Sequence, residues 1–532
     1  MTDYDYIIIG AGSAGCVLAN RLSESGRHKV LLLEAGPDRE GFWVRTPAGV
    51  SFLFLNPAIN WMYHSAAEPH LDNRQIYQPR GKLMGGSSAI NGMVFIRGNQ
   101  HDYDSWAAAG NSGWSAADVL PYFRRMETNL DFLDQYHGAT GPLRVARASC
   151  DVEVANAFVE SGRAAGLPAT EDFNGAQQEG TQLYQFSISE GRRNSAAHAY
   201  LKPARRRPNL QTIDRAMVTG LLLEGRRVTG ARYVRNGVAH EVRAHETILA
   251  GGSINSPQLL MLSGIGPAAH LRECGIEVAH DLPGVGANLQ DHLSVQVNYE
   301  TREGMSLNKA LSGWRKYLNG VRYVLSGSGP LSLGSSQAAA FIRTTPEASA
   351  PDIQISFRAW SFDFDATGNL KMHSYPGAQG AVILLHPKPR GRITLDPAQP
   401  AQAPVLHFNY LSAPEDEATM LRGIRWMRRI AAVGPFGAAV VRERDPGARL
   451  QTDAELLAHV RAAATCVYHP AGTCRMGVDD MAVVDPQLRV HGLAGLRVVD
   501  ASIMPTMTSG NTNAPVMMIA ERAADLILES AG

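Results

Sequence analysis

The stretch YDYIIIGAGSAGCVLANRLSESGRHKVLLLEAG, residues 4–36, reads as a strand, a glycine turn, a helix and a second strand. Its Ile-rich run at 5–9 and the run Val30–Leu33 are typical of buried parallel strands. The turn between them has the spacing G-x-G-x-x-G, formed by Gly10, Gly12 and Gly15. In this pattern the first glycine allows a tight turn, the second lets a pyrophosphate approach the backbone, and the third lets the helix pack on the strand.

The second strand ends at an acidic residue, Glu34. A carboxylate at this place suits the two ribose hydroxyls of an adenosine and would repel a 2′-phosphate. The helix N-terminus presents free N–H groups and the positive end of its dipole to a phosphate. The stretch therefore predicts a dinucleotide site, at which FAD and NAD are both possible.

The charge balance bears on the partners of the chain. Its 532 residues include 50 Lys plus Arg and 50 Asp plus Glu, so the formal net charge is zero. A nucleic-acid partner would require a basic surface, and none is expected. The five cysteines contain no C-x-x-C pair, which argues against a disulfide framework and fits a reducing compartment.

The sequence shows no sign of a targeting or membrane-spanning segment. The first strand follows the N-terminus almost at once, without a basic and then apolar leader, and no apolar run reaches spanning length. We therefore expect a cytoplasmic protein without stable membrane insertion. The segment WRKYLNGVRYVL at 314–325 is basic and amphipathic, so peripheral contact with the inner membrane stays open. A surface helix of the fold is favoured, because the segment is short and contains Gly320.

The middle of the chain predicts a return to the first sheet. Residues 209–234 alternate apolar and polar side chains and predict antiparallel strands with turns at Gly220 and Gly225. Residues 246–250 form a further predicted strand, followed by glycines and a helix from about Ser256 to Leu262. This repeats the strand–glycine–helix order of the N-terminus.

Residues 295–465 have a different composition, which predicts a second, antiparallel domain with covering helices. Its predicted strands are Ile353–Phe357, Gly380–Leu385 and Arg392–Leu395, and its predicted helices are Pro414–Val433 and Asp453–Ala464. After it come a strand at Leu496–Val499 and a last helix with Pro515 in its first turn.

The segment CVYHPAGTCRMG at 466–477 contains the candidate catalytic residue, His469. Histidine near neutral pKa is the usual general base for an alcohol proton. A zinc site built on Cys466, His469 and Cys474 lacks a fourth ligand, so no metal is expected. A serine hydrolase is disfavoured because the G-x-S-x-G motif is absent.

Together these segments resemble the glucose–methanol–choline (GMC) oxidoreductases, and most closely the bacterial choline-dehydrogenase-like and aliphatic-alcohol dehydrogenases. The resemblance covers nearly the whole chain. It is carried in order by GAGSAG with Glu34, GKLMGGSSAINGMVFIRG at 81–98, GGSINSPQLLMLSGIG at 251–266, LPGVGANLQDH at 282–292, YHPAGTCRMG at 468–477, and LRVVDASIMP with GNTNAP at 496–515.

The resemblance implies an α/β fold with a Rossmann-like FAD-binding domain and a second α+β domain for the substrate, built on an antiparallel sheet. The implied FAD-binding domain comprises residues 1–155, 208–294 and 466–532, and the substrate domain comprises 156–207 and 295–465. Some family members attach FAD covalently through a histidine in the second glycine segment. Ile90 occupies that position here, so non-covalent FAD is expected.

The resemblance also implies the site residues. The catalytic pair is His469, which removes the hydroxyl proton, and Asn511, which stabilises the forming alkoxide; many members use two histidines instead. The residues implied to bind the cofactor are Gly10, Gly12, Ser13, Ala14, Gly15, Glu34, Ala35, Trp61, Leu83, Gly85, Asn91, Gly92, Met93, Val94, Val218, Ala250, Tyr468, Asp500, Ala501, Thr512 and Asn513.

The implied activity is FAD-dependent oxidation of a small-molecule alcohol to an aldehyde or ketone, with electrons passed to a quinone or another acceptor such as a dye. An oxidase that reduces oxygen to hydrogen peroxide, a choline dehydrogenase and a non-catalytic flavoprotein stay open as alternatives. The sequence does not identify the alcohol. A cationic substrate such as choline would require a carboxylate or an aromatic cage, and none can be identified from the sequence.

Overall fold

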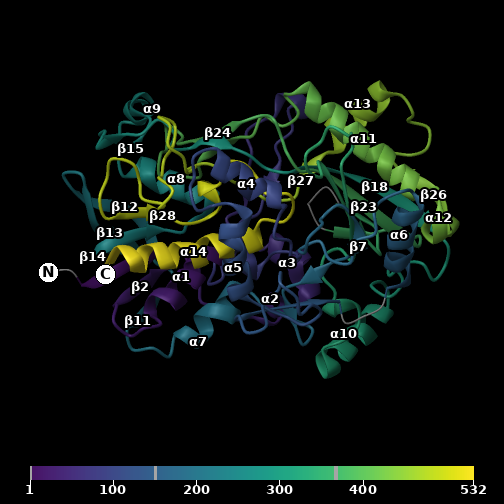
Figure 1. The fold of residues 1–532 in the computed structure, drawn as a ribbon, viewed down its shortest axis with the longest axis horizontal. Coiled ribbons are helices and arrows are strands. Elements are labelled where there is room, and N and C mark those ends of the chain that lie inside the picture. Colours follow the sequence, from purple (N-terminus) through teal and green to yellow (C-terminus); the bar gives the residue numbers. More distant parts are fainter. Residues whose placement is uncertain (1–2, 149–151, 365–369, 532) are drawn as a thin grey trace.

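The computed structural model describes residues 3–148, 152–364 and 370–531 (Figure 1). Two seven-stranded sheets dominate it. One is a mixed sheet on the side of the two termini, and the other is an antiparallel sheet at the opposite end (Figure 1). The α/β class with a second antiparallel sheet is therefore confirmed.

The first sheet is parallel around the strand that carries the glycine turn. β1 (Tyr4–Ile9) pairs in parallel with β2 (Val30–Leu33) and with β14 (Val238–Leu249), so that Ile8 lies between Leu32 and Ile248. β11 (Leu210–Ile213) extends this parallel part beyond β2, and β28 (Leu496–Val498) pairs with β14. The predicted return of the middle segment and of the C-terminal strand to the first sheet is confirmed.

The antiparallel part of this sheet differs from the prediction in two places. β12 (Met217–Glu224) and β13 (Arg227–Arg235) are antiparallel and turn at Gly225, as expected. Gly220, however, lies inside β12 next to an irregularity in the pairing, and does not form a turn. β11 pairs in parallel with β2 rather than with the strands that follow it in sequence. The backbone N–H and C=O groups to which it bonds are those of β2, which would otherwise be the edge strand of the sheet.

Helices pack over the parallel strands and point their N-termini at the strand ends. α1 (Ser13–Ser23) packs against the C-terminal helix α14 (Asn513–Ala531). A Cβ on Gly15 would lie 1.9 Å from the Gly10 carbonyl oxygen, so only glycine allows α1 to approach the turn this closely. α8 (Gly252–Leu262) begins four residues earlier than predicted, because the Asp500 carboxylate accepts a hydrogen bond from the N–H of Gly252 at 2.8 Å.

The second sheet is antiparallel throughout. Its order is β26 (Val440–Asp445), β18 (Leu293–Thr301), β23 (Gly377–Leu384), β20 (Ile353–Arg358), β19 (Ala338–Ile342) and β7 (Gly180–Leu183), and β27 (Thr465–Cys466) also pairs with β18. α11 (Pro414–Ile430) and α6 (Glu153–Ala164) cover one face. The predicted strands and helices of this region are confirmed to within a few residues.

The other helices are α2 (Phe42–Arg45), α3 (Val50–Phe54), α4 (Gln100–Ala108), α5 (Ala116–Met126), α7 (Lys202–Ala204), α9 (Ala268–Glu273), α10 (Arg315–Ser326), α12 (Gly434–Ala439) and α13 (Asp453–Ala463), and the short helical turns include η1 (Pro47–Gly49), η4 (Ala197–Leu201) and η5 (Pro330–Ser332). The other strands are β3 (Tyr63–His64), β4 (Tyr77–Gln78), β5 (Glu127–Asn129), β6 (Leu143–Arg147), β8 (Gln185–Phe186), β9 (Ile188–Ser189), β10 (Arg192–Arg193), β15 (Ile265–Gly266), β16 (His280–Asp281), β17 (Ala287–Leu289), β21 (Phe362–Phe364), β22 (Leu370–Met372), β24 (Gly391–Thr394) and β25 (Val405–His407).

The division into two discontinuous domains remains a proposal, which the two sheets support. β7 joins the second sheet, in agreement with the assignment of residues 156–207 to the substrate domain. η4 and α7 nevertheless pack on α1, so we propose that the boundary lies before residue 197.

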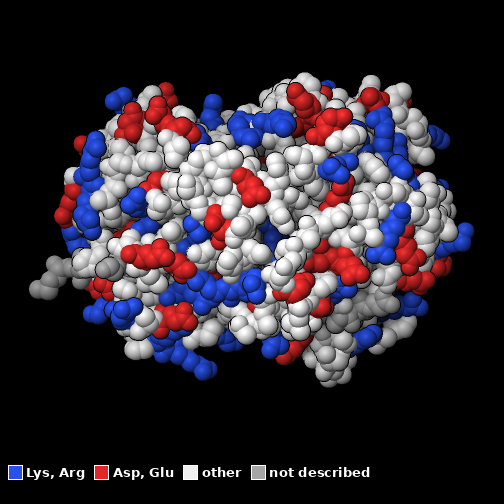
Figure 2. Space-filling view, viewed as in Figure 1, with Lys and Arg blue, Asp and Glu red and all other residues white. Residues whose placement is uncertain are grey.

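The state of the cysteines, the hydropathy of the helices and the surface charge bear on the compartment and the partners of the chain. Cys16, Cys274, Cys466 and Cys474 are free, and Cys150 lies outside the described residues. None of the described helices combines the length and hydropathy needed to cross a bilayer. Figure 2 shows basic and acidic side chains interspersed over the face in view.

Candidate active site

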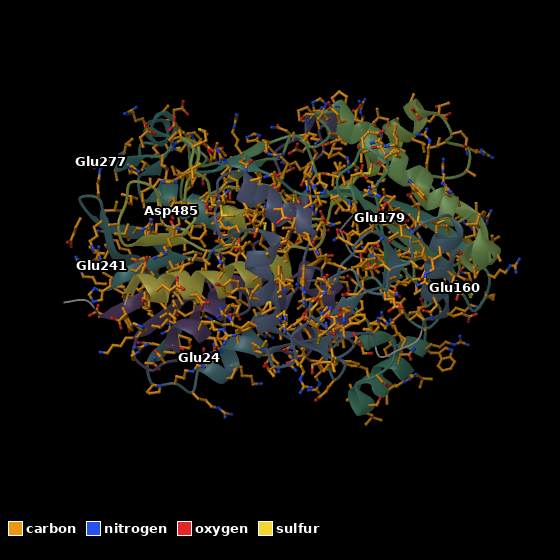
Figure 3. All side chains as sticks on the ribbon, viewed as in Figure 1. Glu24, Glu160, Glu179, Glu241, Glu277 and Asp485 are labelled. Atoms are coloured by element: carbon orange, nitrogen blue, oxygen red, sulfur yellow. The ribbon has the colours of Figure 1, made fainter. Side chains whose placement is uncertain are left out.

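One cavity of about 2120 Å³ lies between the two sheets. It extends from the glycine turn and Glu34 to His469 and Asn511. Exposed acids such as Glu24, Glu160 and Glu241 lie at the periphery of the molecule (Figure 3). Glu34 and Asp500, in contrast, are buried and line the cavity.

The Glu34 carboxylate forms the end of the cavity next to the glycine turn. Its two oxygens accept hydrogen bonds from the backbone N–H of Ala11 at 2.9 Å and of Gly36 at 2.8 Å. Burial raises the pKa of Glu34 to about 7, although both hydrogen bonds oppose the shift. Each oxygen keeps a further lone pair, which is what two ribose hydroxyls require.

The second glycine segment packs directly on the first. A Cβ on Gly86, whose φ is +50°, would lie 2.7 Å from the Cα of Gly12. The backbone of residues 86–94 therefore forms a wall beside the glycine turn, and Ile90 to Val94 line the cavity. Ile90 offers no nucleophile for a covalent bond to a cofactor.

Two helix N-termini meet at the centre of the cavity. The Ser13 hydroxyl donates to the Asn513 side-chain oxygen at 2.7 Å, which joins the first turn of α1 to the first turn of α14. Asp500 holds the N-terminus of α8 and also accepts from Ser256 Oγ at 2.6 Å. Helix N-termini stabilise the negative charge of phosphate groups and of a reduced ring system.

Most of the predicted cofactor residues line this cavity. Those that do are Gly10, Gly12, Ser13, Ala14, Glu34, Ala35, Trp61, Asn91, Gly92, Met93, Val94, Val218, Ala250, Tyr468, Asp500, Ala501, Thr512 and Asn513. Gly15, Leu83 and Gly85 lie behind the lining. Gly15 receives α1 against the turn, and Gly85 N–H donates to the Ala11 carbonyl at 2.7 Å.

The predicted catalytic pair meets at the far end of the cavity. His469 Nε2 and Asn511 Nδ2 are 3.3 Å apart. The loop that carries Asn511 is anchored by Asp102, whose carboxylate accepts from the N–H of Ser509 at 2.6 Å and from its hydroxyl at 2.8 Å. A single alcohol oxygen can therefore contact both His469 and Asn511.

His292, for which the sequence predicted no role, fixes the tautomer of His469. Its Nε2 lies 3.1 Å from the Leu385 carbonyl oxygen, which can only accept, so Nε2 carries the proton. Its Nδ1 lies 3.0 Å from His469 Nδ1 and must be the acceptor when His292 is neutral. His469 thus carries its proton on Nδ1, and its Nε2 presents a lone pair to the cavity.

Burial lowers the pKa of His469 to about 3, and the guanidinium of Arg80 acts in the same direction. Burial also lowers the pKa of His292 well below its usual value. Both rings are therefore neutral at physiological pH, in contrast to the near-neutral pKa expected for the base. Asp291 accepts from the His469 backbone N–H at 2.7 Å and fixes the position of this residue.

Asp291 and His292 belong to the segment LPGVGANLQDH, which contributes to the family resemblance but predicted no role for either residue. The signal in the sequence that could have indicated their role is that these two polar residues directly precede a buried strand, β18. Among the described residues, no group of three or more His, Cys, Asp or Glu side chains could hold a metal ion.

The substrate side of the cavity is a polar face of the second sheet. Paired positions on its three central strands form rows: Ser294, Ile383 and Gln354; then Gln296, Ala381 and Ser356; then Asn298, Gln379 and Arg358. Ser294 Oγ, Gln296 Oε1 and Gln354 Oε1 are buried and have no hydrogen-bond partner among the described residues. Arg358 donates to Gln379 at 2.6 Å and to Ser336 at 3.3 Å.

A cavity with a dinucleotide cradle at one end and a neutral histidine base at the other is that of an oxidoreductase. Two GMC oxidoreductase models match the chain, over residues 4–294 and 387–520. The chain belongs to the GMC oxidoreductase family and is an enzyme that uses FAD. The cradle fits this cofactor, and Ile90 agrees with its non-covalent binding.

Similar proteins cover nearly the whole chain. An oxygen-dependent choline dehydrogenase of Brucella suis biovar 1 (strain 1330) is 44% identical over 530 residues, which are 98% of this chain and 95% of the relative. A pyridoxine 4-oxidase from Mesorbium loti is 32% identical with a TM-score of 0.89, over 99% of both chains. A formate oxidase of Aspergillus oryzae RIB40, a variant studied for its FAD modification, is 27% identical with a TM-score of 0.91, over 99% of this chain and 98% of the other.

Proposed function

We propose that the enzyme oxidises an alcohol to an aldehyde or ketone, with His469 as general base and Asn511 as hydrogen-bond donor to the substrate oxygen. The proton-free Nε2 of His469, held 3.3 Å from Asn511 Nδ2, carries this proposal. An alcohol that enters between them donates its proton to Nε2 and accepts from Nδ2.

Bound FAD supplies the acceptor for the hydride that leaves the carbinol carbon. The residues of this chain supply the rest. The N–H at His469 Nδ1 stays hydrogen-bonded to His292 Nδ1 while His469 Nε2 takes the substrate proton. The transferred proton therefore has one defined position, on Nε2. Asn511 Nδ2–H stays near the oxygen as negative charge develops there.

The proposed substrate is a neutral alcohol that carries further oxygen atoms, rather than choline. Hydroxyl or ether groups would pair with the unpartnered polar atoms of Ser294, Gln296 and Gln354. The guanidinium of Arg358 would repel a quaternary ammonium, and it already covers the Phe362 ring.

The carboxylates among the described lining residues do not favour choline either. Glu34 and Asp500 belong to the cofactor end. Asp363 pairs with His373 at 2.8 Å, and Asp445 lies 3.9 Å from His459. Choline remains the second candidate, because the relatives with 44% identity are choline dehydrogenases.

We further propose that electrons pass to a quinone or another acceptor, with oxygen as the alternative acceptor. The similar proteins support both routes, since the relatives are oxygen-dependent choline dehydrogenases and two structural neighbours are oxidases. The free cysteines support a location inside the cell, and peripheral contact with the inner membrane would give access to a lipid-soluble acceptor.

The test is anaerobic bleaching of the flavin absorbance by a panel of choline, aliphatic, benzylic and polyhydroxylated alcohols. We expect the largest second-order rate constant for a neutral, oxygen-bearing alcohol, and a loss of about 10²–10⁴-fold in His469→Ala. Faster bleaching by choline would refute the substrate class, and an unchanged rate in His469→Ala would refute the base. Peroxide yield against dye reduction then separates oxidase from dehydrogenase.

A further inference from the structure

α10 projects from the molecule at the end occupied by the second sheet (Figure 1). In it, only Tyr323 is buried, and its hydroxyl donates to the Gly191 carbonyl at 3.0 Å. The large apolar side chains of this helix are exposed. They are Trp314, at the position before the first turn, and Tyr317, Leu318, Val321, Val324 and Leu325.

These six side chains form one stripe. At about 100° per residue they fall within about 120° of the helix circumference, on the side opposite to Tyr323. Arg315 and Arg322 fall together along one edge of the stripe. The helix has no acidic residue. An apolar face with cations along its edge is the pattern of a helix that lies in the interface of a membrane.

The apolar surface continues beyond the helix. The Phe42 ring contacts the Tyr323 ring at 6.2 Å between centroids, and Trp43 lies against Phe52 at 4.4 Å. Phe42, Trp43 and Phe52 are also exposed. η1 packs on η5, which holds this part of the chain next to α10. Aromatic side chains of this kind gather at membrane interfaces.

The surface also surrounds an opening of the active-site cavity. Tyr317, Val321, Val324 and Leu325 of α10 line the cavity, as do Phe42, Trp43 and Phe52. A small molecule that passes between the solvent and the catalytic pair through this opening would therefore pass along the exposed apolar surface. Figure 2 shows mostly uncharged side chains where α10 projects.

We propose that this surface, formed by α10 with Phe42, Trp43 and Phe52, lies on an anionic lipid bilayer, so that the cavity opens toward the membrane. The cationic edge selects the partner. Arg315 and Arg322 would contact anionic headgroups while the stripe enters the acyl boundary. A second copy packed antiparallel on this face, across a two-fold axis perpendicular to α10, would instead bring the same cationic edges together. The inference rests on the proposed function only for the identity of the molecule that enters the cavity from the bilayer. That molecule would be a lipid-soluble electron acceptor or an amphiphilic alcohol.

The test is co-sedimentation of the holoenzyme with phosphatidylcholine vesicles that contain or lack phosphatidylglycerol, without substrate. We expect binding that requires phosphatidylglycerol and weakens with salt. Val321→Glu and, as a second variant, Leu325→Glu should each lower vesicle binding about tenfold or more. Val238→Glu is the matched control, because Val238 lies on the first sheet and is 57% exposed, against 58% for Val321.

Circular dichroism and FAD content establish that the variants are folded. Arg315→Gln with Arg322→Gln should remove the preference for phosphatidylglycerol. Three results would overturn the proposal: no binding of the wild type, equal binding by Val321→Glu, or a wild-type dimer that Val321→Glu dissociates in the absence of vesicle binding. Since no turnover is measured, failure of the alcohol chemistry cannot be confused with failure of membrane docking.

Discussion

The N–H at His469 Nδ1 donates to His292 Nδ1, and the N–H at His292 Nε2 in turn donates to the Leu385 carbonyl oxygen. This arrangement matters because a neutral histidine has two tautomers, of which only one has a lone pair on Nε2. His292 decides between them without contact to the substrate, and is therefore a positioning residue. Asp291 acts on the same ring through the backbone, and its other carboxylate oxygen accepts from Tyr410 at 2.7 Å.

Replacement of His292 should therefore slow the chemical step more than it affects binding. In His292→Leu, the Nδ1 proton of His469 loses its acceptor, and we expect flavin reduction to slow about ten- to a hundredfold with little change in the apparent Kd for the alcohol. His292→Gln, which can accept at the same place, should recover part of the rate. Rapid mixing under anaerobic conditions measures both, and equal rates in the Leu and Gln variants would contradict the tautomer argument.

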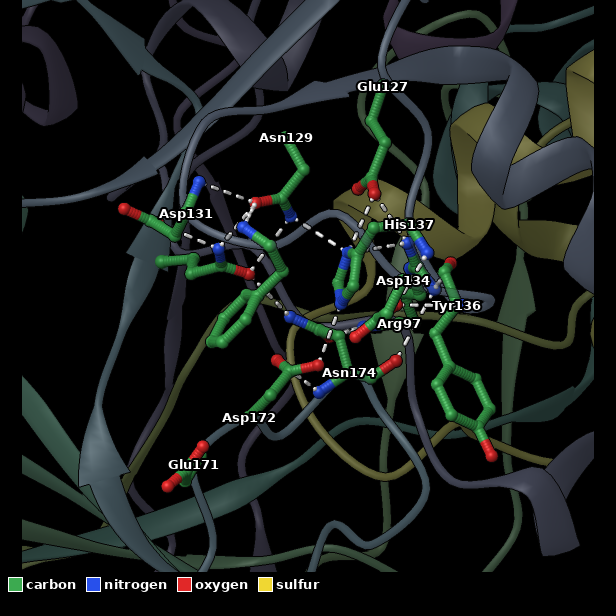
Figure 4. Close-up of polar contacts among 12 residues, drawn as sticks. Arg97, Glu127, Asn129, Asp131, Asp134, Tyr136, His137, Glu171, Asp172 and Asn174 are labelled. Atoms are coloured by element: carbon green, nitrogen blue, oxygen red, sulfur yellow. Dashed lines mark hydrogen bonds and ion pairs between the residues drawn. The ribbon is translucent and has the colours of Figure 1, made fainter.

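At the scale of elements, a buried polar cluster ties together β5, the segment before α4, the loop between β5 and β6 and the turn before β7 (Figure 4). His137 Nδ1 contacts Glu127 and its Nε2 contacts Asp172, each at 2.8 Å, and Arg97 contacts Glu127 at 2.7 Å. Burial alone would lower the pKa of His137, but the hydrogen bonds to Asp172 and Glu127 outweigh it and raise the pKa to about 9. Arg97 helps to hold the pKa of Glu127 below its usual value against the effect of burial.

This cluster should make stability depend on pH in the alkaline range. The charged form of His137 stabilises the fold fully below its unfolded pKa of about 6.5, and the contribution is lost as the pH rises through about 9. His137→Asn should therefore cost about 2 kcal/mol at pH 6 and much less at pH 10. Thermal unfolding of both proteins at the two pH values measures the difference. A cost that is the same at both would show that His137 is neutral in the fold.

Several elements could be predicted from local sequence, and others could not. The strand–turn–helix unit around Gly10 could be, because its pattern is contained in residues 4–36. The turn assigned to Gly220 was wrong, since glycine also fits an irregularity within a strand. The contact between His292 and His469 joins residues 177 positions apart and is made only when β27 pairs with β18. No local pattern contains that information.

At the scale of the whole molecule, the cavity lies between the two sheets and joins the glycine turn to the catalytic pair. Of the predicted site residues, local motifs indicated Gly10, Gly12, Glu34 and His469, and the family resemblance identified Asn511 and most other cofactor positions; these residues line this cavity. Their roles remain predictions. The polar face of the second sheet was not identified, because alternating residues on three strands form it only after the strands pair.

Removal of FAD should destabilise the whole chain. Ligand present at about a hundredfold excess over its Kd stabilises the native state by about 2.7 kcal/mol. We expect the apoprotein to unfold at a lower temperature, and added FAD to restore the midpoint with a dependence on its concentration. Differential scanning calorimetry of the two forms tests this, and coincident midpoints would contradict a cofactor held between the two sheets.

The hydrogen bond between Ser13 and Asn513 has a consequence for biosynthesis. It joins residues 500 positions apart, and Asn513 opens the helix that packs against α1. The glycine turn leaves the ribosome early, but the opposite side of its pocket does not yet exist. We therefore expect cofactor capture to be a late event, since a nascent chain interrupted before residue 469 would have the glycine turn and neither member of the catalytic pair.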